Sequence, residues 1–219
     1  MDKLLEKYSS TIQEKFNIFR VFSLFFVIYF LSNLNSIEYK SYAEHLFKRS
    51  ISQLLDFDAL KSNANVGVAI VAIFSVTLGV ALFSKIAKEI MMGQISRRNY
   101  FEKLDVIKKE FFFDKKSGVK EKIEMGRYID ECSGKIAVKI KFVYGLAEFF
   151  FISSWTFFTA FFFGGLMDFI AFLACLVFSF FLLVRSQIEF ISKLSGFLVA
   201  KSLLFGVDIN KVFSDGHDG

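Results

Sequence analysis

The sequence predicts an all-α integral membrane protein with four transmembrane helices and with both the N and C termini in the cytoplasm. Its composition, its lack of proline and its long apolar runs predict this class. Of 219 residues, 54% are hydrophobic and 18% aromatic, including 32 Phe and no Pro. The 22% charged residues cannot cover that much apolar surface in a monomeric water-soluble fold. The composition excludes disordered, collagen-like and disulfide-scaffold proteins and argues against a soluble enzyme.

The first predicted span lies within residues 1–35, where an apolar run extends from Ile18 to Leu34 with Arg20 as its one charge. The uninterrupted part is short, since about 20 residues cross a bilayer. Arg20 is expected to extend toward the lipid headgroups, so that its neighbours join the span. A cleaved signal peptide is the competing interpretation. The end of the run has no small-x-small cleavage pattern, and we therefore expect an uncleaved anchor.

Residues 66–87 form the second predicted span, which has no charge before Lys85. Small side chains let helix backbones approach closely in lipid, where burial from water no longer drives helix pairing. The alternative is that small residues are simply frequent in spans. The predicted helix-packing face consists of Ala69, Ala72, Ser75 and Gly79.

Residues 142–184 are apolar apart from two acids, Glu148 and Asp168. A single helix of this length would measure about 65 Å, twice the thickness of the hydrocarbon core. Gly164-Gly165 offers a break before Asp168. The sequence therefore predicts a transmembrane hairpin, with helices at Phe142–Phe163 and Met167–Val184.

The distribution of Lys and Arg predicts the orientation. The connection from Lys85 to Lys141 contains 15 basic and 9 acidic residues, whereas residues 35–65 contain 4 of each. Excess positive charge stays in the cytoplasm. This places residues 36–65, an amphipathic loop, outside the cell and residues 88–141 inside it. The chain is expected to end with an amphipathic cytoplasmic helix and a flexible tail over residues 185–219.

The sequence of the cytoplasmic region 88–141 predicts helices with weak breaks at Ser117-Gly118 and Ser133-Gly134. Three consecutive Phe cannot share one helix face, so some of them should contact a partner subunit, another protein or lipid. The candidate docking residues are Phe101, Leu104, Phe111, Phe112 and Phe113.

Glu148 is the most informative polar residue within the predicted spans, because a lone acid in lipid is costly. In a symmetric oligomer it could contribute to a ring of carboxylates along an ion or proton pathway. The structural alternative is a single buried acid that is protonated or hydrogen-bonded within the bundle. The polar stripe on its helix consists of Tyr144, Glu148, Thr156 and Thr159.

No catalytic or metal-binding pattern accompanies these features. The chain has two His, no phosphate-binding glycine loop and no zinc-ligand spacing, so we expect neither an enzyme nor a cofactor nor a metal site. The expected partners are the lipid bilayer, further copies of the chain and a cytoplasmic protein. Direct nucleic-acid binding is not expected, because basic and acidic residues are mixed along the chain.

Four spans bordered by Arg20, Lys85, Lys141 and Arg185, together with the charged helices from Glu89 to Ile140, give an architecture that resembles a known family. The chain resembles the four-helix membrane subunits (KwaA) of the Kiwa bacterial anti-phage defence systems. The resemblance implies a homo-oligomeric subunit of the inner membrane that senses infection and docks a soluble effector. The alternatives from the residues alone are a pore-forming, membrane-depolarising effector and an immunity protein that binds another membrane protein.

Overall fold

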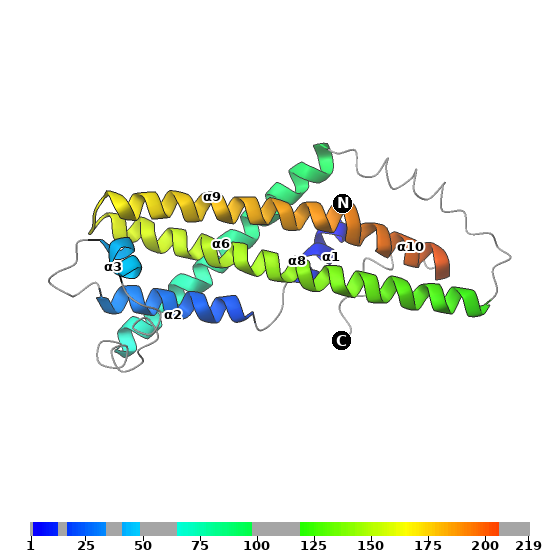
Figure 1. The fold of residues 1–219 in the computed structure, drawn as a ribbon, viewed down its shortest axis with the longest axis horizontal. Coiled ribbons are helices and arrows are strands. Elements are labelled where there is room, and N and C mark those ends of the chain that lie inside the picture. The colour runs from blue at the N-terminus through cyan, green and yellow to red at the C-terminus, as the bar shows by residue number, and fades with distance from the viewer. Residues whose placement is uncertain (1, 13–16, 34–40, 49–64, 98–118, 206–219) are drawn as a thin grey trace. The chain divides into compact units, whose positions relative to one another are not determined.

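The computed structural model describes residues 2–12, 17–33, 41–48, 65–97 and 119–205, and these residues contain helices and turns but no strand. The prediction of an all-α protein is confirmed for this part of the chain. Its elements in order are α1 (Asp2–Ile12), α2 (Ile18–Asn33), α3 (Tyr42–Lys48), α6 (Val66–Arg97), α8 (Val119–Phe161), α9 (Leu166–Glu189), the π-helix η1 (Phe190–Leu194) and α10 (Ser195–Phe205), as Figure 1 shows.

The chain divides into two compact units. The first unit comprises Met1–Lys15, Ile86–Tyr144 and Leu183–Gly219, and the second comprises Phe16–Lys85 and Gly145–Leu182. The helices α6, α8 and α9 each contribute residues to both units.

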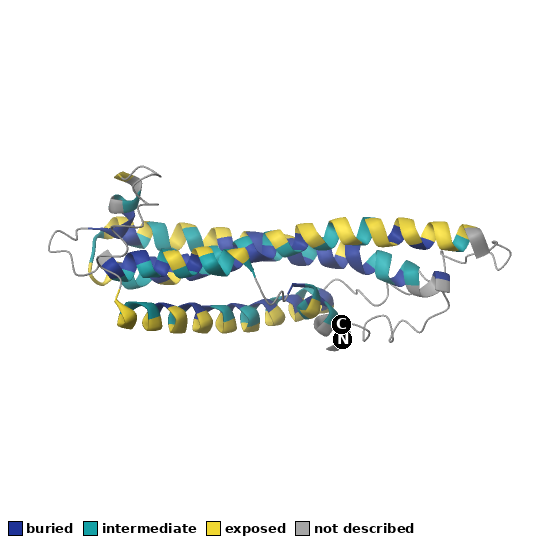
Figure 2. Ribbon diagram, turned by 90° about the horizontal axis from the view of Figure 1, so that it is seen from below, coloured by how far each residue is buried: buried dark blue, intermediate teal, exposed yellow. Residues whose placement is uncertain are grey.

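Two helical segments are long and apolar enough to cross a membrane. They are Val66–Ser96, with a mean hydropathy of 2.6, and Leu166–Lys201, with a mean hydropathy of 2.5. Only 17% and 22% of their most apolar windows are buried, whereas the core helix of a soluble protein would be mostly buried. Figure 2 shows exposed residues along the sides of the long helices. By length, hydropathy and low burial these two segments are candidate membrane spans.

The turn between α8 and α9 lies where the sequence predicts a break in the apolar stretch. The N–H groups of Phe162 and Phe163 donate to the carbonyls of Thr159 and Ala160, at 3.2 and 2.9 Å, and α9 begins at Leu166. Within the second unit α8 and α9 are joined by a hydrogen bond from the Ser179 hydroxyl to the Ala147 carbonyl, at 2.8 Å.

The core of the second unit is apolar and rich in aromatic side chains from α2, α3 and α8. In one cluster Tyr42 of α3 packs against Phe30 and Phe157, with ring centroids 4.9 and 5.6 Å apart. Such edge and tilted contacts between rings add about 0.5–1.5 kcal/mol per pair to the effect of burial. A second cluster joins α2, α6 and α8 through Val27, Ala72, Val76 and Ile152.

The helix α8 differs from the prediction of a break at Ser133-Gly134, because it continues through these residues without interruption. A glycine inside a helix costs only about 1 kcal/mol relative to alanine, too little to end a helix supported on both sides. The other predicted break, at Ser117-Gly118, lies outside the described residues.

The core of the first unit includes a helix that the sequence analysis did not predict. The Tyr8 ring of α1 is fully buried and packs edge-on against Tyr144 of α8 and Phe190 of η1, with centroids 6.2 and 5.1 Å apart. The spacing of Leu4, Leu5, Tyr8 and Ile12 is the helical signal that could have revealed α1.

Candidate functional site

The candidate site of the second unit is built around the two acids of the apolar hairpin, Glu148 of α8 and Asp168 of α9. Both carboxylates are buried, with relative exposures of 1% and 0%. An ionised carboxylate in such surroundings costs several kcal/mol unless a partner compensates it. The structure gives each of them partners within the same chain.

Glu148 forms an ion pair with Arg20 of α2. The Arg20 Nε donates to Oε1 at 2.7 Å and Nη2 donates to Oε2 at 3.2 Å. This two-point geometry matches the planar guanidinium to the carboxylate and is the stronger form of such a pair. The expectation that Arg20 extends toward lipid headgroups is therefore wrong for this side chain, which points at Glu148 and keeps 31% of its surface exposed. The arrangement agrees with the structural alternative for Glu148.

A close approach of α2 to α8 brings the pair together. A Cβ atom at Gly145, one turn before Glu148, would lie 2.5 Å from Phe19 Cδ2 and 2.8 Å from Asn17 Nδ2. Asn17 also accepts the N–H of Phe19 at 3.0 Å through its side chain, which starts α2 at this point. Gly145 thus lets the first turn of α2 lie against α8 and places Arg20 within reach of Glu148.

Asp168 holds the first turn of α3. Its carboxylate accepts the backbone N–H of Tyr42 at 3.2 Å and that of Ala43 at 2.7 Å. These N–H groups have no partner within a helix at its N-terminus, and the positive end of the helix favours a negative charge there. Gly164, in the turn before α9, leaves space for this carboxylate, since its Cβ would overlap Asp168 Oδ2.

The hydroxyl residues of the predicted polar stripe bond within their own helix. Thr156 donates to the Ile152 carbonyl at 3.1 Å and Thr159 donates to the Trp155 carbonyl at 3.0 Å. Tyr144 belongs to the first unit, where its ring contacts Tyr8. The two threonine hydroxyls therefore donate to backbone carbonyls one turn earlier on α8.

The predicted helix-packing face on α6 is partly buried. Ala72 is fully buried against Val27 and Ile152, and a Cβ at Gly79 would lie 3.1 Å from Ile152 Cγ1. Ala69 and Ser75 are half-buried. Ser75 and Gly79, with Thr156 and Thr159, line a cavity of about 170 Å³ between α2, α6 and α8. The small residues therefore adjoin both α8 and this largely apolar cavity.

A polar cluster in the first unit was missed by the sequence analysis. Gln187 of α9 is fully buried; its amide donates to the Ala87 carbonyl of α6 at 2.7 Å and accepts from Gln94 Nε2 at 3.0 Å. Tyr8 lies 3.5 Å from the Ser186 hydroxyl, and burial raises the pKa of Tyr8 to about 12, so its hydroxyl stays neutral at physiological pH. The cluster joins α1, α6 and α9.

The predicted docking residues Phe101, Leu104 and Phe111 to Phe113 lie outside the described residues. Within the described ranges, no group of three or more His, Cys, Asp or Glu could hold a metal ion. Cys132 and Cys175 are both free thiols. Compared with known protein families, with curated proteins and with solved structures, the chain gives no match.

Proposed function

We propose that the chain is a non-enzymatic, multi-pass subunit of the bacterial inner membrane that forms a homo-oligomer and docks a cytoplasmic effector protein. In this proposal α2, α6, α8 and α9 supply four spans, and both termini and residues 88–141 are cytoplasmic. The resemblance of the architecture to the Kiwa membrane subunits supports a role in anti-phage defence.

The observation that carries the proposal is the continuity of α8. Its first half, residues 119–141, is highly charged, whereas the half from Phe142 to Phe161 is apolar with Glu148 as its one acid. A helix of 43 residues measures about 65 Å, of which a hydrocarbon core accounts for about 30 Å. The charged half thus adds about 35 Å of helix to the apolar half, as an anchor that presents a partner outside the hydrocarbon core would require.

The charged half of α8 offers a surface for such a partner. Met125, Tyr128 and Val138 are 41%, 64% and 67% exposed, in a segment rich in charged residues. Apolar and aromatic side chains of this kind, surrounded by polar residues, are typical of protein interfaces. We propose that they extend the docking surface predicted for the preceding segment.

The engaged carboxylates support an anchor rather than a conducting effector. A carboxylate that lines a cation pathway must exchange partners with passing ions. Glu148 instead lies in a two-point ion pair and Asp168 caps a helix, and both are buried.

Co-purification tests the docking role. The triple variant Met125→Gln, Tyr128→Gln, Val138→Gln should lose the cytoplasmic protein that accompanies the wild type from detergent extracts, while the mass of its own oligomer stays the same. The matched control is Glu124→Gln with Arg127→Gln, which alters exposed charges on the same helix. Retention of the same protein by the triple variant would refute the assignment of this surface.

Thiol labelling tests the orientation. Cys132 lies in the charged half of α8 and is half-buried, so a Cys175→Ser chain has one natural reporter. A membrane-impermeant maleimide should label it only after the cells are permeabilised. Labelling in intact spheroplasts would place residues 88–141 outside and overturn the topology.

A further inference from the structure

In the first unit, three cations gather around one carboxylate. Glu189 Oε1 lies 2.8 Å from Lys139 Nζ of α8 and 3.8 Å from Arg185 Nε, one helical turn earlier on α9. Lys193, four residues after Glu189 and on the π-helix, is exposed and close enough for its charge to act on this carboxylate. Three positive charges and one negative charge leave a local surplus of two.

The surplus charge is accessible, whereas the carboxylate is largely covered. The side chains of Lys139 and Arg185 are 51% and 52% exposed, and that of Glu189 is 13% exposed. Glu189 therefore contacts both cations, and about half of each cationic side chain remains accessible. Arginine presents these donors in a planar fork that fits a phosphate.

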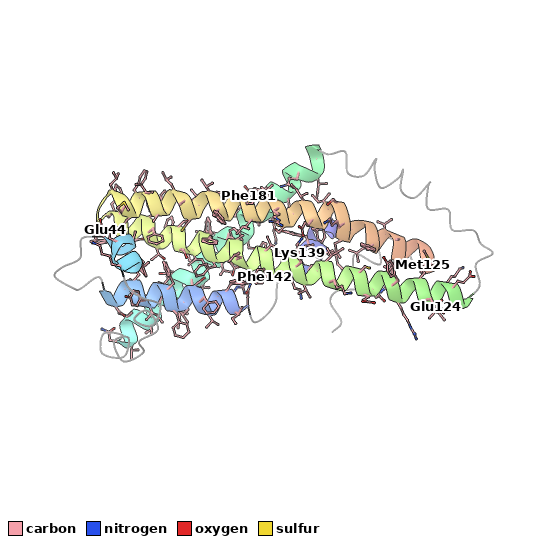
Figure 3. The ribbon with its side chains drawn as sticks, viewed as in Figure 1. Glu44, Glu124, Met125, Lys139, Phe142 and Phe181 are labelled. Atoms are coloured by element: carbon pink, nitrogen blue, oxygen red, sulfur yellow. The ribbon has the colours of Figure 1, made fainter. Side chains whose placement is uncertain are left out.

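The cations lie at the limits of the apolar segments. Arg185 is the first charged residue after the run Met167–Val184, which follows the hairpin turn and has Asp168 as its one acid. On α8, Phe142 is 59% exposed three residues after Lys139, and Figure 3 shows Lys139 and Phe142 on this helix. Exposed apolar side chains next to exposed cations match a phospholipid, which has acyl chains below and a phosphate above.

We propose that Lys139, Arg185 and Lys193, arranged around Glu189, bind the phosphate of an anionic phospholipid. The inference rests on the membrane embedding proposed above but not on the docking of an effector. The exposed Phe142 favours a lipid over free phosphate, because a soluble anion makes no use of an apolar border. Glu189 is a positioning residue, which fixes Lys139 and Arg185 and limits the affinity through its own negative charge.

Lipid titration of the purified full-length chain tests the site. Phosphatidylglycerol is titrated into the chain held in phosphatidylcholine nanodiscs, and retained lipid is counted by native mass spectrometry. Each Lys or Arg near a membrane surface contributes about fivefold to the affinity for anionic lipid. The double variant Arg185→Gln, Lys193→Gln is therefore expected to bind about 25-fold more weakly. Equal affinity of this variant and the wild type would overturn the proposal.

Two further variants separate binding from folding. Lys201→Gln removes a cation of the same unit whose Nζ lies 2.6 Å from Asp130 Oδ1, and it should leave the affinity unchanged. Glu189→Gln removes the competing negative charge and should raise the affinity about fivefold, whereas a merely structural role would lower it. A fall in affinity with Glu189→Gln would refute the arrangement.

Two further experiments test whether the bound phosphate belongs to a lipid and whether the chain is embedded in the membrane. Inorganic phosphate at millimolar concentration should not displace phosphatidylglycerol, and displacement would overturn the assignment to a lipid. Extraction of cell membranes with alkaline carbonate should leave the chain in the pellet. Its release would refute the membrane embedding itself, whereas retention without a preference for phosphatidylglycerol would refute the lipid site alone.

Discussion

The ion pair between Arg20 and Glu148 predicts unequal effects of removing its two members. Both Arg20→Gln and Glu148→Gln break the same two hydrogen bonds, but they leave different groups behind. Glu148 is 1% exposed and cannot reach water or headgroups, whereas the Arg20 side chain is 31% exposed. Arg20 can therefore find a new polar partner after its acid is removed, and Glu148 cannot.

The magnitudes follow from this difference in exposure. Removing one member of a buried ion pair costs about 3–5 kcal/mol when the other charge stays buried, and we expect this loss for Arg20→Gln. For Glu148→Gln the loss should be nearer the 1.5–3 kcal/mol of a hydrogen bond to a charged group, about half as large. The double variant should recover part of the loss, because neither charge of this pair then remains buried.

Equilibrium unfolding in mixed micelles of mild detergent and SDS measures these free energies, and Trp155 of α8 provides a fluorescence signal in the second unit. The double-mutant cycle gives the coupling directly. The reasoning fails if Glu148→Gln is as destabilising as Arg20→Gln or more so. It also fails if the two losses are additive, because an uncompensated charge would then not be their cause.

Three further predictions use the same unfolding assay, and a fourth uses thermal unfolding. Asp168→Asn should lower the free energy of unfolding by about 1–3 kcal/mol, because the amide nitrogen is a donor where two backbone N–H groups need an acceptor. An unchanged free energy would contradict the capping of α3 by Asp168. Gly145→Ala should lower the free energy of unfolding by about 1–3 kcal/mol, because the added methyl group overpacks the contact with α2. The control Gly93→Ala, with nothing within 4 Å of the added Cβ, should raise it by about 0.5–1 kcal/mol. Equal effects of the two substitutions would exclude the close approach of α2 to α8. Gln187→Leu should lose about 1–3 kcal/mol, because Gln94 Nε2 then lacks its acceptor, and no loss would mean that the amide contact is not made. The hydrogen bond from Lys135 lowers the pKa of Glu131 below its usual 4.5, so this exposed pair should stabilise the fold slightly above pH 4.5. This contribution should disappear as the pH falls through the lowered pKa. The melting temperatures of Glu131→Gln and the wild type should therefore converge at low pH, and divergence would contradict the pairing.

The elements that could be predicted from the sequence are those that composition alone dictates. Long apolar runs without proline form helices whichever way they pack, and two adjacent glycines after a run longer than a bilayer mark a turn. The α8–α9 turn at Gly164-Gly165 is such a case. The continuity of α8 through Ser133-Gly134 is not, because a weak helix breaker is decided by the packing of the helix on its neighbours, which a local pattern does not contain.

The partners of the polar residues could not be predicted for a similar reason. Glu148 was recognisable as a buried acid, but 128 positions separate it from Arg20, and the contact depends on where α2 lies along α8. The same holds for Asp168, whose partners are backbone N–H groups and so leave no trace in residue type. The sequence nevertheless limits the possible partners. Its apolar runs contain two acids, Glu148 and Asp168, and one arginine, Arg20, so few ion pairs or hydrogen bonds can compensate the buried charges.

The two carboxylates together explain how the short helix α2 is held in the second unit. The 16 residues of α2 measure about 24 Å, less than the hydrocarbon thickness, and so its length alone does not fix its depth or its neighbours. Glu148 binds α2 near its start through Arg20, whereas Asp168 binds α3, whose Tyr42 packs on Phe30 near the end of α2. The α8–α9 hairpin thus fixes this segment close to both of its ends. Each acid is costly alone in an apolar bundle, and that cost makes unfavourable any other register of α2 and α3 in which the acids would lose these partners.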